Sequence, residues 1–184
     1  MDPKELIGQA QLLFVEGKIN ESIELFKKAL DEGGDPFMIN LTLGAAKMKL
    51  NDYENAIEYL NKTIEINNKN PRPYYYRGLA HLHKKEYDKA IADFTYAIEL
   101  KPDFYQAKFA RATSYAKLKM FNEAADDLKS IMPALQSNVQ GLVDTYGIIR
   151  TELWDVISQL SGEAQKSIGL TDQELQSIKN LLEE

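Results

Sequence analysis

Small and apolar residues recur along the chain at a fixed step of 34 residues. Ala10, Gly44, Gly78 and Ala112 form one column of this repeat. Four further columns keep the same step: Ile19, Tyr53, Tyr87 and Phe121; Ser22, Ala56, Ala90 and Ala124; Phe26, Leu60, Phe94 and Leu128; and Leu30, Ile64, Ile98 and Met132. A small residue lets two helices approach closely, and apolar residues four apart share one helix face. Each unit is therefore predicted to be two antiparallel helices.

The step divides most of the chain into four units. We expect them at residues 3–36, 37–70, 71–104 and 105–136. Pro133 is expected to shorten or kink the second helix of the fourth unit, because proline lacks a backbone N–H and its ring clashes with the preceding turn. A break is then predicted from Ala134 to Asn138. The turns inside the first three units are predicted at Gly17-Lys18, Leu50-Asn51-Asp52 and Lys84-Lys85-Glu86.

The chain after residue 136 departs from the repeat. Apolar residues at steps of three and four predict a capping helix over residues 137–160, and Trp154 is expected to pack within it. Residues 161–184 are read as a linker and a short amphipathic tail helix, which Thr171 and Glu174 begin as a capping box. A helix this short is marginal alone, so we expect it to dock, preferably on its own solenoid. Docking on another chain, including self-association of two copies, stays open.

The third unit carries a known signature at matching positions. Tyr74, Arg77-Gly78, His81, Ala90, Phe94 and Pro102 resemble the aromatic, Leu-Gly, Tyr, Ala-x3-Phe and Pro pattern of the tetratricopeptide repeat (TPR) family. Arg77 and His81 depart from the usual Leu and Tyr. The resemblance implies an all-α, right-handed solenoid of antiparallel helix pairs. It also implies that the first helix of each pair lines a concave groove.

Matching positions imply that largely apolar side chains line this groove. An uncovered apolar strip usually marks a binding surface. The chain is therefore predicted to be a non-catalytic adaptor or scaffold that binds an apolar or amphipathic segment of a partner protein. A chaperone-like holdase for exposed hydrophobic segments is the alternative, and packing of some of these residues on neighbouring helices or on the chain's own tail also stays open. The residues expected to contact the ligand are Ile7, Gln11, Phe14, Met38, Leu41, Met48, Arg72, Tyr75, Tyr76, Leu79, Leu82, His83 and Phe109.

One branch of the family binds the acidic C-terminal tails of heat-shock chaperones through a clamp of Lys, Asn and Arg. The matching positions in this chain are Ile7, Gln11, Thr42, Arg72 and Tyr76. Only Arg72 is basic. We therefore do not expect this carboxylate clamp to form.

Composition excludes several other classes of function. A net charge of -6 argues against a general nucleic-acid binder, which would present a basic face. The absence of cysteine excludes disulfides, thiolate catalysis and cysteine-ligated zinc. No apolar run reaches the length of a membrane span, so we expect no membrane insertion and a cytoplasmic location.

Candidate catalytic residues are few. His81 and His83 are the two histidines, and a spacing of two places them on different helix faces, where they cannot jointly hold a metal. We expect His81 to be a hydrogen-bonded interior histidine and His83 to lie at the groove. No phosphate-binding glycine loop follows a strand. The sequence thus predicts no enzyme activity, cofactor or metal.

Overall fold

The computed structural model describes residues 2–137, 171–173 and 176. Residues 138–160 of the predicted capping helix, with Trp154, and the linker before Thr171 lie outside the described residues. So does Glu174 of the predicted capping box. The described part of the chain forms two compact units, with the boundary between Glu86 and Tyr87. The boundary between them falls inside the third predicted repeat.

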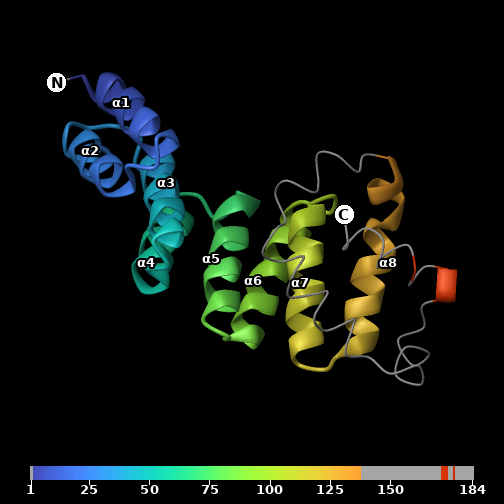
Figure 1. Cartoon of the computed structure of the whole chain (residues 1–184). Coiled ribbons are helices and arrows are strands. Elements are labelled where there is room, and N and C mark those ends of the chain that lie inside the picture. Colours follow the sequence, from blue (N-terminus) through green and yellow to red (C-terminus); the bar gives the residue numbers. More distant parts are fainter. Residues whose placement is uncertain (1, 138–170, 174–175, 177–184) are drawn as a thin grey trace. The chain divides into compact units, whose positions relative to one another are not determined.

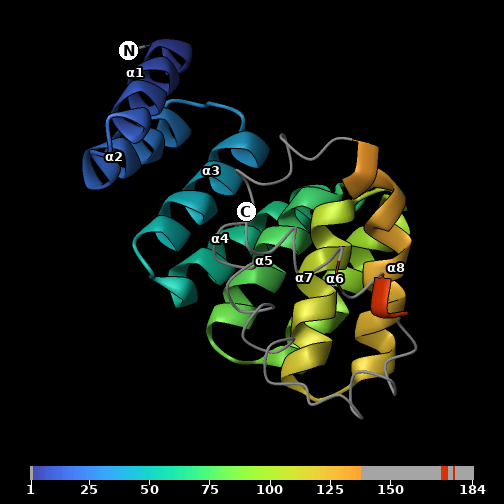
Figure 2. The same cartoon turned by 45° about the vertical axis from the view of Figure 1, so that its right-hand side comes forward.

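Successive α-helices joined by short turns make up the described chain (Figure 1). In the first unit, α1 pairs with α2 and α3 with α4, and α5 contacts both α3 and α4. In the second unit, α7 contacts α6 and α8. Figure 2 shows the same helices from a second direction. Their bounds are α1 (Pro3–Val15), α2 (Ile19–Asp31), α3 (Pro36–Lys49), α4 (Tyr53–Ile66), α5 (Pro71–His83), α6 (Tyr87–Leu100), α7 (Tyr105–Lys117) and α8 (Phe121–Ser137).

Three of these helices begin with the same local device. The side chains of Asp2, Asp35 and Asn70 accept hydrogen bonds from backbone N–H groups of α1, α3 and α5, at 2.9 to 3.0 Å. Each cap is followed by a proline at the first helical position, where its fixed φ already suits the helix. The sequence thus sets the starts of α1, α3 and α5 at Pro3, Pro36 and Pro71, each within one residue of the repeat step.

The turns within the repeats share one geometry. Gly17, Asn51, Lys85 and Lys119, each 34 residues after the last, have φ of 80°, 57°, 62° and 61°. After each of them, the next backbone N–H donates back to a carbonyl five residues earlier, as Lys18 N does to Leu13 O at 2.9 Å. This is the Schellman motif, which satisfies carbonyls at the end of the first helix. The turns predicted at Gly17, Asn51 and Lys85 are confirmed.

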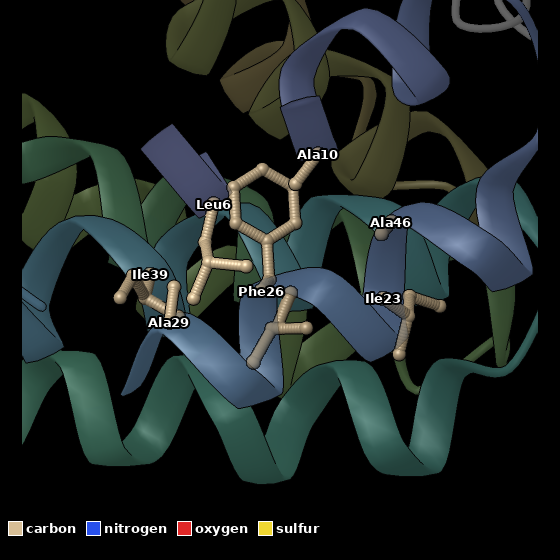
Figure 3. Close-up of a cluster of buried hydrophobic side chains, with 8 residues drawn as sticks. Leu6, Ala10, Ile23, Phe26, Ala29, Ile39 and Ala46 are labelled. Atoms are coloured by element: carbon tan, nitrogen blue, oxygen red, sulfur yellow. The ribbon is translucent and has the colours of Figure 1, made fainter. Parts of the chain in front are cut away.

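A core of apolar side chains holds the helices of the first unit together. The ring of Phe26 lies beside Leu6 and Ala10, and Ile39 and Ala46 of α3 belong to the same cluster (Figure 3). Beside this cluster, Ser22 Oγ donates to Ala10 O at 2.8 Å, which satisfies a buried hydroxyl. The column predicted for the second helices is buried throughout: Phe26, Leu60, Phe94 and Leu128.

A charged pair replaces apolar contacts in the second unit. Arg111 of α7 donates from Nε and Nη2 to the two carboxylate oxygens of Asp127 on α8, at 2.7 and 2.6 Å. Its Nη1 donates to Thr95 Oγ1 of α6 at 3.0 Å. Asp127 is buried, so the bidentate pair neutralises a charge that would otherwise be costly. Arg111 therefore connects three successive helices.

The break predicted from Ala134 is wrong as far as Ser137, because α8 continues from Phe121 to Ser137 through Pro133. Proline removes one helical hydrogen bond, but its φ near -65° is itself helical. Three turns already formed before Pro133 can carry that loss. Asn138 lies outside the described residues.

Candidate functional site

The predicted groove residues of the first unit come from one face of each of the helices α1, α3 and α5. Their spacing of three and four residues keeps them together on each helix. We call this set the first-helix face: Lys4, Ile7, Gly8, Gln11, Phe14 and Val15; Met38, Leu41, Thr42, Ala45, Met48 and Lys49; and Arg72, Tyr75, Tyr76, Leu79, Leu82 and His83. Phe109 lies on α7 in the second unit, where it is half-buried.

The predicted ligand contacts on this face differ in exposure. Tyr75 and Leu82 are buried, at 7% and 3% exposed, so in this conformation they support the face from beneath. Met38 is 44% exposed. Gln11 and Arg72 are exposed as well, and the remaining predicted contacts are half-buried: Ile7, Phe14, Leu41, Met48, Tyr76, Leu79 and His83. The face therefore offers partly exposed apolar side chains from three helices.

Phe14 is held in place from two sides. With Ile7 it packs against the core cluster of the first unit. Lys49, at the end of α3, places its Nζ 4.6 Å from the centroid of the Phe14 ring, within the range of a cation–π contact. This contact joins α1 to α3 and puts a positive charge beside an apolar ring.

Matching repeat positions place Lys49 on the groove side, but the sequence does not single it out as a ligand contact. It stands 35 residues after Phe14, one position beyond the repeat step. That offset, between adjacent first helices, is the sequence signal that could have identified the contact.

The two histidines have separate partners. His81 Nδ1 lies 2.7 Å from Glu86 Oε2, whereas the His83 ring stacks on Tyr53 of α4, with centroids 5.1 Å apart and planes 5° from parallel. His81 is half-buried and hydrogen-bonded, as predicted. In the part of the chain that the structure describes, no group of three or more His, Asp or Glu side chains is placed to hold a metal ion.

Some polar groups on the first-helix face already have partners on their own helix. Thr42 Oγ1 donates to Met38 O of its own helix at 2.8 Å. The rings of Tyr75 and Tyr76 lie 5.5 Å apart at 57°. Burial raises the pKa of the Tyr75 phenol well above its usual value, so it stays neutral. Among the clamp positions considered above, Arg72 supplies the one cation.

Two family models match the centre of the chain. One, described as tetratricopeptide repeat, matches residues 71–104, and the other, described as TPR repeat, matches residues 44–84. The chain is therefore a TPR repeat protein. The resemblance seen in the sequence and the predicted all-α solenoid of antiparallel helix pairs are therefore confirmed. TPR domains generally mediate interactions between proteins.

Curated relatives share only a part of their length with this TPR chain. Human serine/threonine-protein phosphatase 5 is 37% identical over 84 residues, which are 46% of this chain and 17% of the phosphatase. Bovine peptidyl-prolyl cis-trans isomerase FKBP4 is 30% identical over 110 residues, or 52% of this chain and 24% of the isomerase. The enzyme activities in these names belong to proteins of which this chain matches less than a quarter.

Solved structures agree on the fold. A crystal structure of the MamA protein superposes with a TM-score of 0.73 at 19% identity, covering 98% of this chain and 90% of MamA. The first TPR of Spaghetti (RPAP3), bound to the HSP90 peptide SRMEEVD, has a TM-score of 0.60 at 22% identity, covering 64% of this chain and 94% of that one. At these identities the likeness shows the fold alone. None of the described helices of this chain is long and apolar enough to cross a membrane.

Proposed function

We propose that this TPR chain is a non-catalytic adaptor whose first-helix face binds an apolar or amphipathic segment of a partner protein. The observation that carries the proposal is the exposure of Met38, at 44%, within a set of half-buried apolar side chains from three helices. Apolar surface gathered in this way usually marks an interaction site. Protein binding is also the general role of TPR domains.

The face combines fixed and adaptable parts. Ile7 and Phe14 rest on the core cluster, so their positions are set before a ligand arrives. Met38 and Met48 have unbranched, flexible side chains that can fit different apolar shapes. Preformed anchors lower the entropic cost of binding, and methionines widen the range of segments that fit.

The expected affinity follows from the number of anchors. Burying three or four apolar side chains of a ligand contributes about 1.5 to 3 kcal/mol each. Association and ordering of the segment cost several kcal/mol. The remainder corresponds to a dissociation constant on the order of micromolar. This strength suits an adaptor that exchanges partners.

We do not expect the first-helix face to bind a chain-terminal carboxylate. The RPAP3 repeat was solved with an HSP90 peptide, but this chain holds Ile7, Gln11 and Thr42 at three of the clamp positions. The Thr42 hydroxyl already donates to Met38 O. At the clamp positions, an apolar side chain at Ile7 and a single cation at Arg72 favour an internal segment over a chain-terminal carboxylate.

Two variants that each replace an exposed apolar residue with glutamate test the proposal. Met38→Glu places a charge on the first-helix face, and Ile66→Glu places one at the end of α4, outside it; the wild-type residues are 44% and 48% exposed. Proteins captured from source cells by the intact chain are identified, and the binding segment is mapped with overlapping peptides.

We expect Met38→Glu to weaken binding of the mapped segment at least tenfold, because burying an unpaired carboxylate is costly. Ile66→Glu should bind like wild type. Equal affinity of both variants would refute the proposed surface. Capture of many unfolded proteins, with no shared segment, would favour the holdase instead.

A further inference from the structure

Acidic and apolar residues are segregated between the helices of the first unit. Glu5 is the one acidic residue of α1, α3 and α5, and it lies off the first-helix face. By contrast, α2 and α4 carry Glu21, Glu24, Asp31, Glu54, Glu58 and Glu65. The whole chain has 28 acidic residues and a net charge of -6. A low number of acidic residues in the chain therefore does not explain why the first-helix face has none.

Cations on the first-helix face are left without acidic partners. Lys4, Lys49 and Arg72 are exposed, and within the described residues none of the three has a carboxylate within ion-pair distance. Elsewhere in the unit, several lysines are paired, as Lys27 is with Glu24 at 2.9 Å and Lys62 with Glu58 at 2.8 Å. A positive surface on an acidic chain attracts an anionic partner.

The positions of these cations border the apolar part of the face. Lys4 and Arg72 lie in the first turns of α1 and α5, whereas Lys49 is the last residue of α3. A helix of this length spans roughly 20 Å, so charge is available near both ends of the apolar strip. The Lys49 contact with Phe14 holds one of these charges directly beside an anchor.

We infer that the first-helix face takes an internal protein segment in which apolar anchors are accompanied by Asp or Glu side chains. This inference rests on the proposed function and specifies its ligand. The apolar residues fill the strip between the helices, while the carboxylates meet Lys49 and Arg72. Acidic side chains also make the segment repel the carboxylates of α2 and α4, which favours the first-helix face over the rest of the unit.

A selection of short random peptides on the intact chain tests the inference. Peptides blocked at both ends are selected on wild type, and those that also bind the Met38→Glu variant are discarded. We expect the retained peptides to combine apolar residues with a net negative charge. Their affinity should fall as ionic strength rises, because salt screens exposed charges.

Charge reversal provides the matched comparison. For a retained acidic peptide, the double variant Lys49→Glu and Arg72→Glu should weaken binding about tenfold. Lys28→Glu reverses an exposed charge on α2, away from the face, and should change affinity less than twofold. A merely structural role of Lys49 is excluded if Lys49→Met keeps the thermal stability but loses the preference for acidic over neutral peptides.

The outcomes distinguish failure of the acidic-ligand inference from failure of the proposed binding surface. Met38-dependent peptides that are neutral or basic would overturn the acidic ligand and leave the binding surface standing. So would an acidic peptide whose affinity ignores the double charge reversal. Recovery of no Met38-dependent peptide would overturn the proposed function and the inference together.

Discussion

Gly44 of α3 lies so close to Leu60 of α4 that a β-carbon added to Gly44 would sit 2.8 Å from Leu60 Cγ. Leu60 is fully buried, and the branch point of its side chain has little room to move. Gly8 of α1 has open space beside it, because a β-carbon added there would meet no atom within 4 Å. The same residue type thus has opposite packing in two adjacent repeats.

Alanine at these two glycines should have effects of opposite sign. Gly44→Ala is expected to lower the free energy of unfolding by about 1 to 3 kcal/mol, because the added methyl overpacks the contact with Leu60. Gly8→Ala should raise it by up to about 1 kcal/mol through helix propensity alone. Urea denaturation of both variants measures this difference. A stabilising Gly44→Ala would contradict the close approach of α3 and α4.

Lys85 adopts a left-handed backbone conformation that is unfavourable for a residue with a side chain. Lys85 has φ of 62° at the position where Gly17 stands two repeats earlier. An L-residue with a side chain pays about 1 to 2 kcal/mol for this conformation, partly offset by the greater freedom of unfolded glycine. Lys85→Gly should therefore raise the free energy of unfolding by up to about 1 kcal/mol. The reverse substitution, Gly17→Lys, should lower it by a similar amount, and unchanged thermal stability of both variants would argue against the Schellman turns.

The buried pair of Arg111 and Asp127 has an apolar counterpart within the same chain. Leu43 and Tyr59 stand at the same two repeat positions, 68 residues earlier. Arg111→Leu alone leaves the Asp127 carboxylate buried without its cation, which should cost about 3 to 5 kcal/mol. Adding Asp127→Tyr should restore most of that loss. A double-mutant cycle in urea measures the coupling, and additive losses would show that the pair does not act as a unit.

Stability in acid should depend on Asp52. Hydrogen bonds from Lys47 and Asn55, led by the 2.8 Å contact with Lys47 Nζ, hold the pKa of Asp52 below its usual range. In the unfolded chain this carboxyl has its ordinary, higher pKa and therefore binds a proton more readily. The stabilisation that Asp52 gives the folded state is fully present above a pH of about 4. It is lost as pH falls through the lower pKa of the folded state. NMR titration of this carboxyl should show the lowered pKa, and Asp52→Asn should flatten the acid limb of the unfolding curve.

Much of the fold was predictable because it depends on local sequence signals that recur in each of the four repeats. Proline after a capping Asp or Asn marks three helix starts, and the 34-residue columns identify core residues such as Phe26 and Phe94. Pro133 misled the prediction at the end of α8. A single proline is a weak stop when a helix of three turns precedes it.

The candidate site was less accessible to sequence reasoning. Repeat positions specify which side of a helix a residue occupies, but not what lies over it. Tyr75 and Leu82 were predicted as ligand contacts with Leu79, yet both are buried and Leu79 is half-buried. The contact of Lys49 with Phe14 depends on the packing of α1 against α3, which no single repeat contains.

Methionine methyl groups report directly whether the first-helix face is the binding surface. Met38 and Met48 lie on that face, whereas Met120 is 37% exposed in the turn before α8. The chain is labelled with carbon-13 at its methionine methyls and titrated with a segment that binds. We expect the signals of Met38 and Met48 to shift and the Met120 signal to stay unchanged. Shifts at Met120 with both face methionines unmoved would contradict binding at that face.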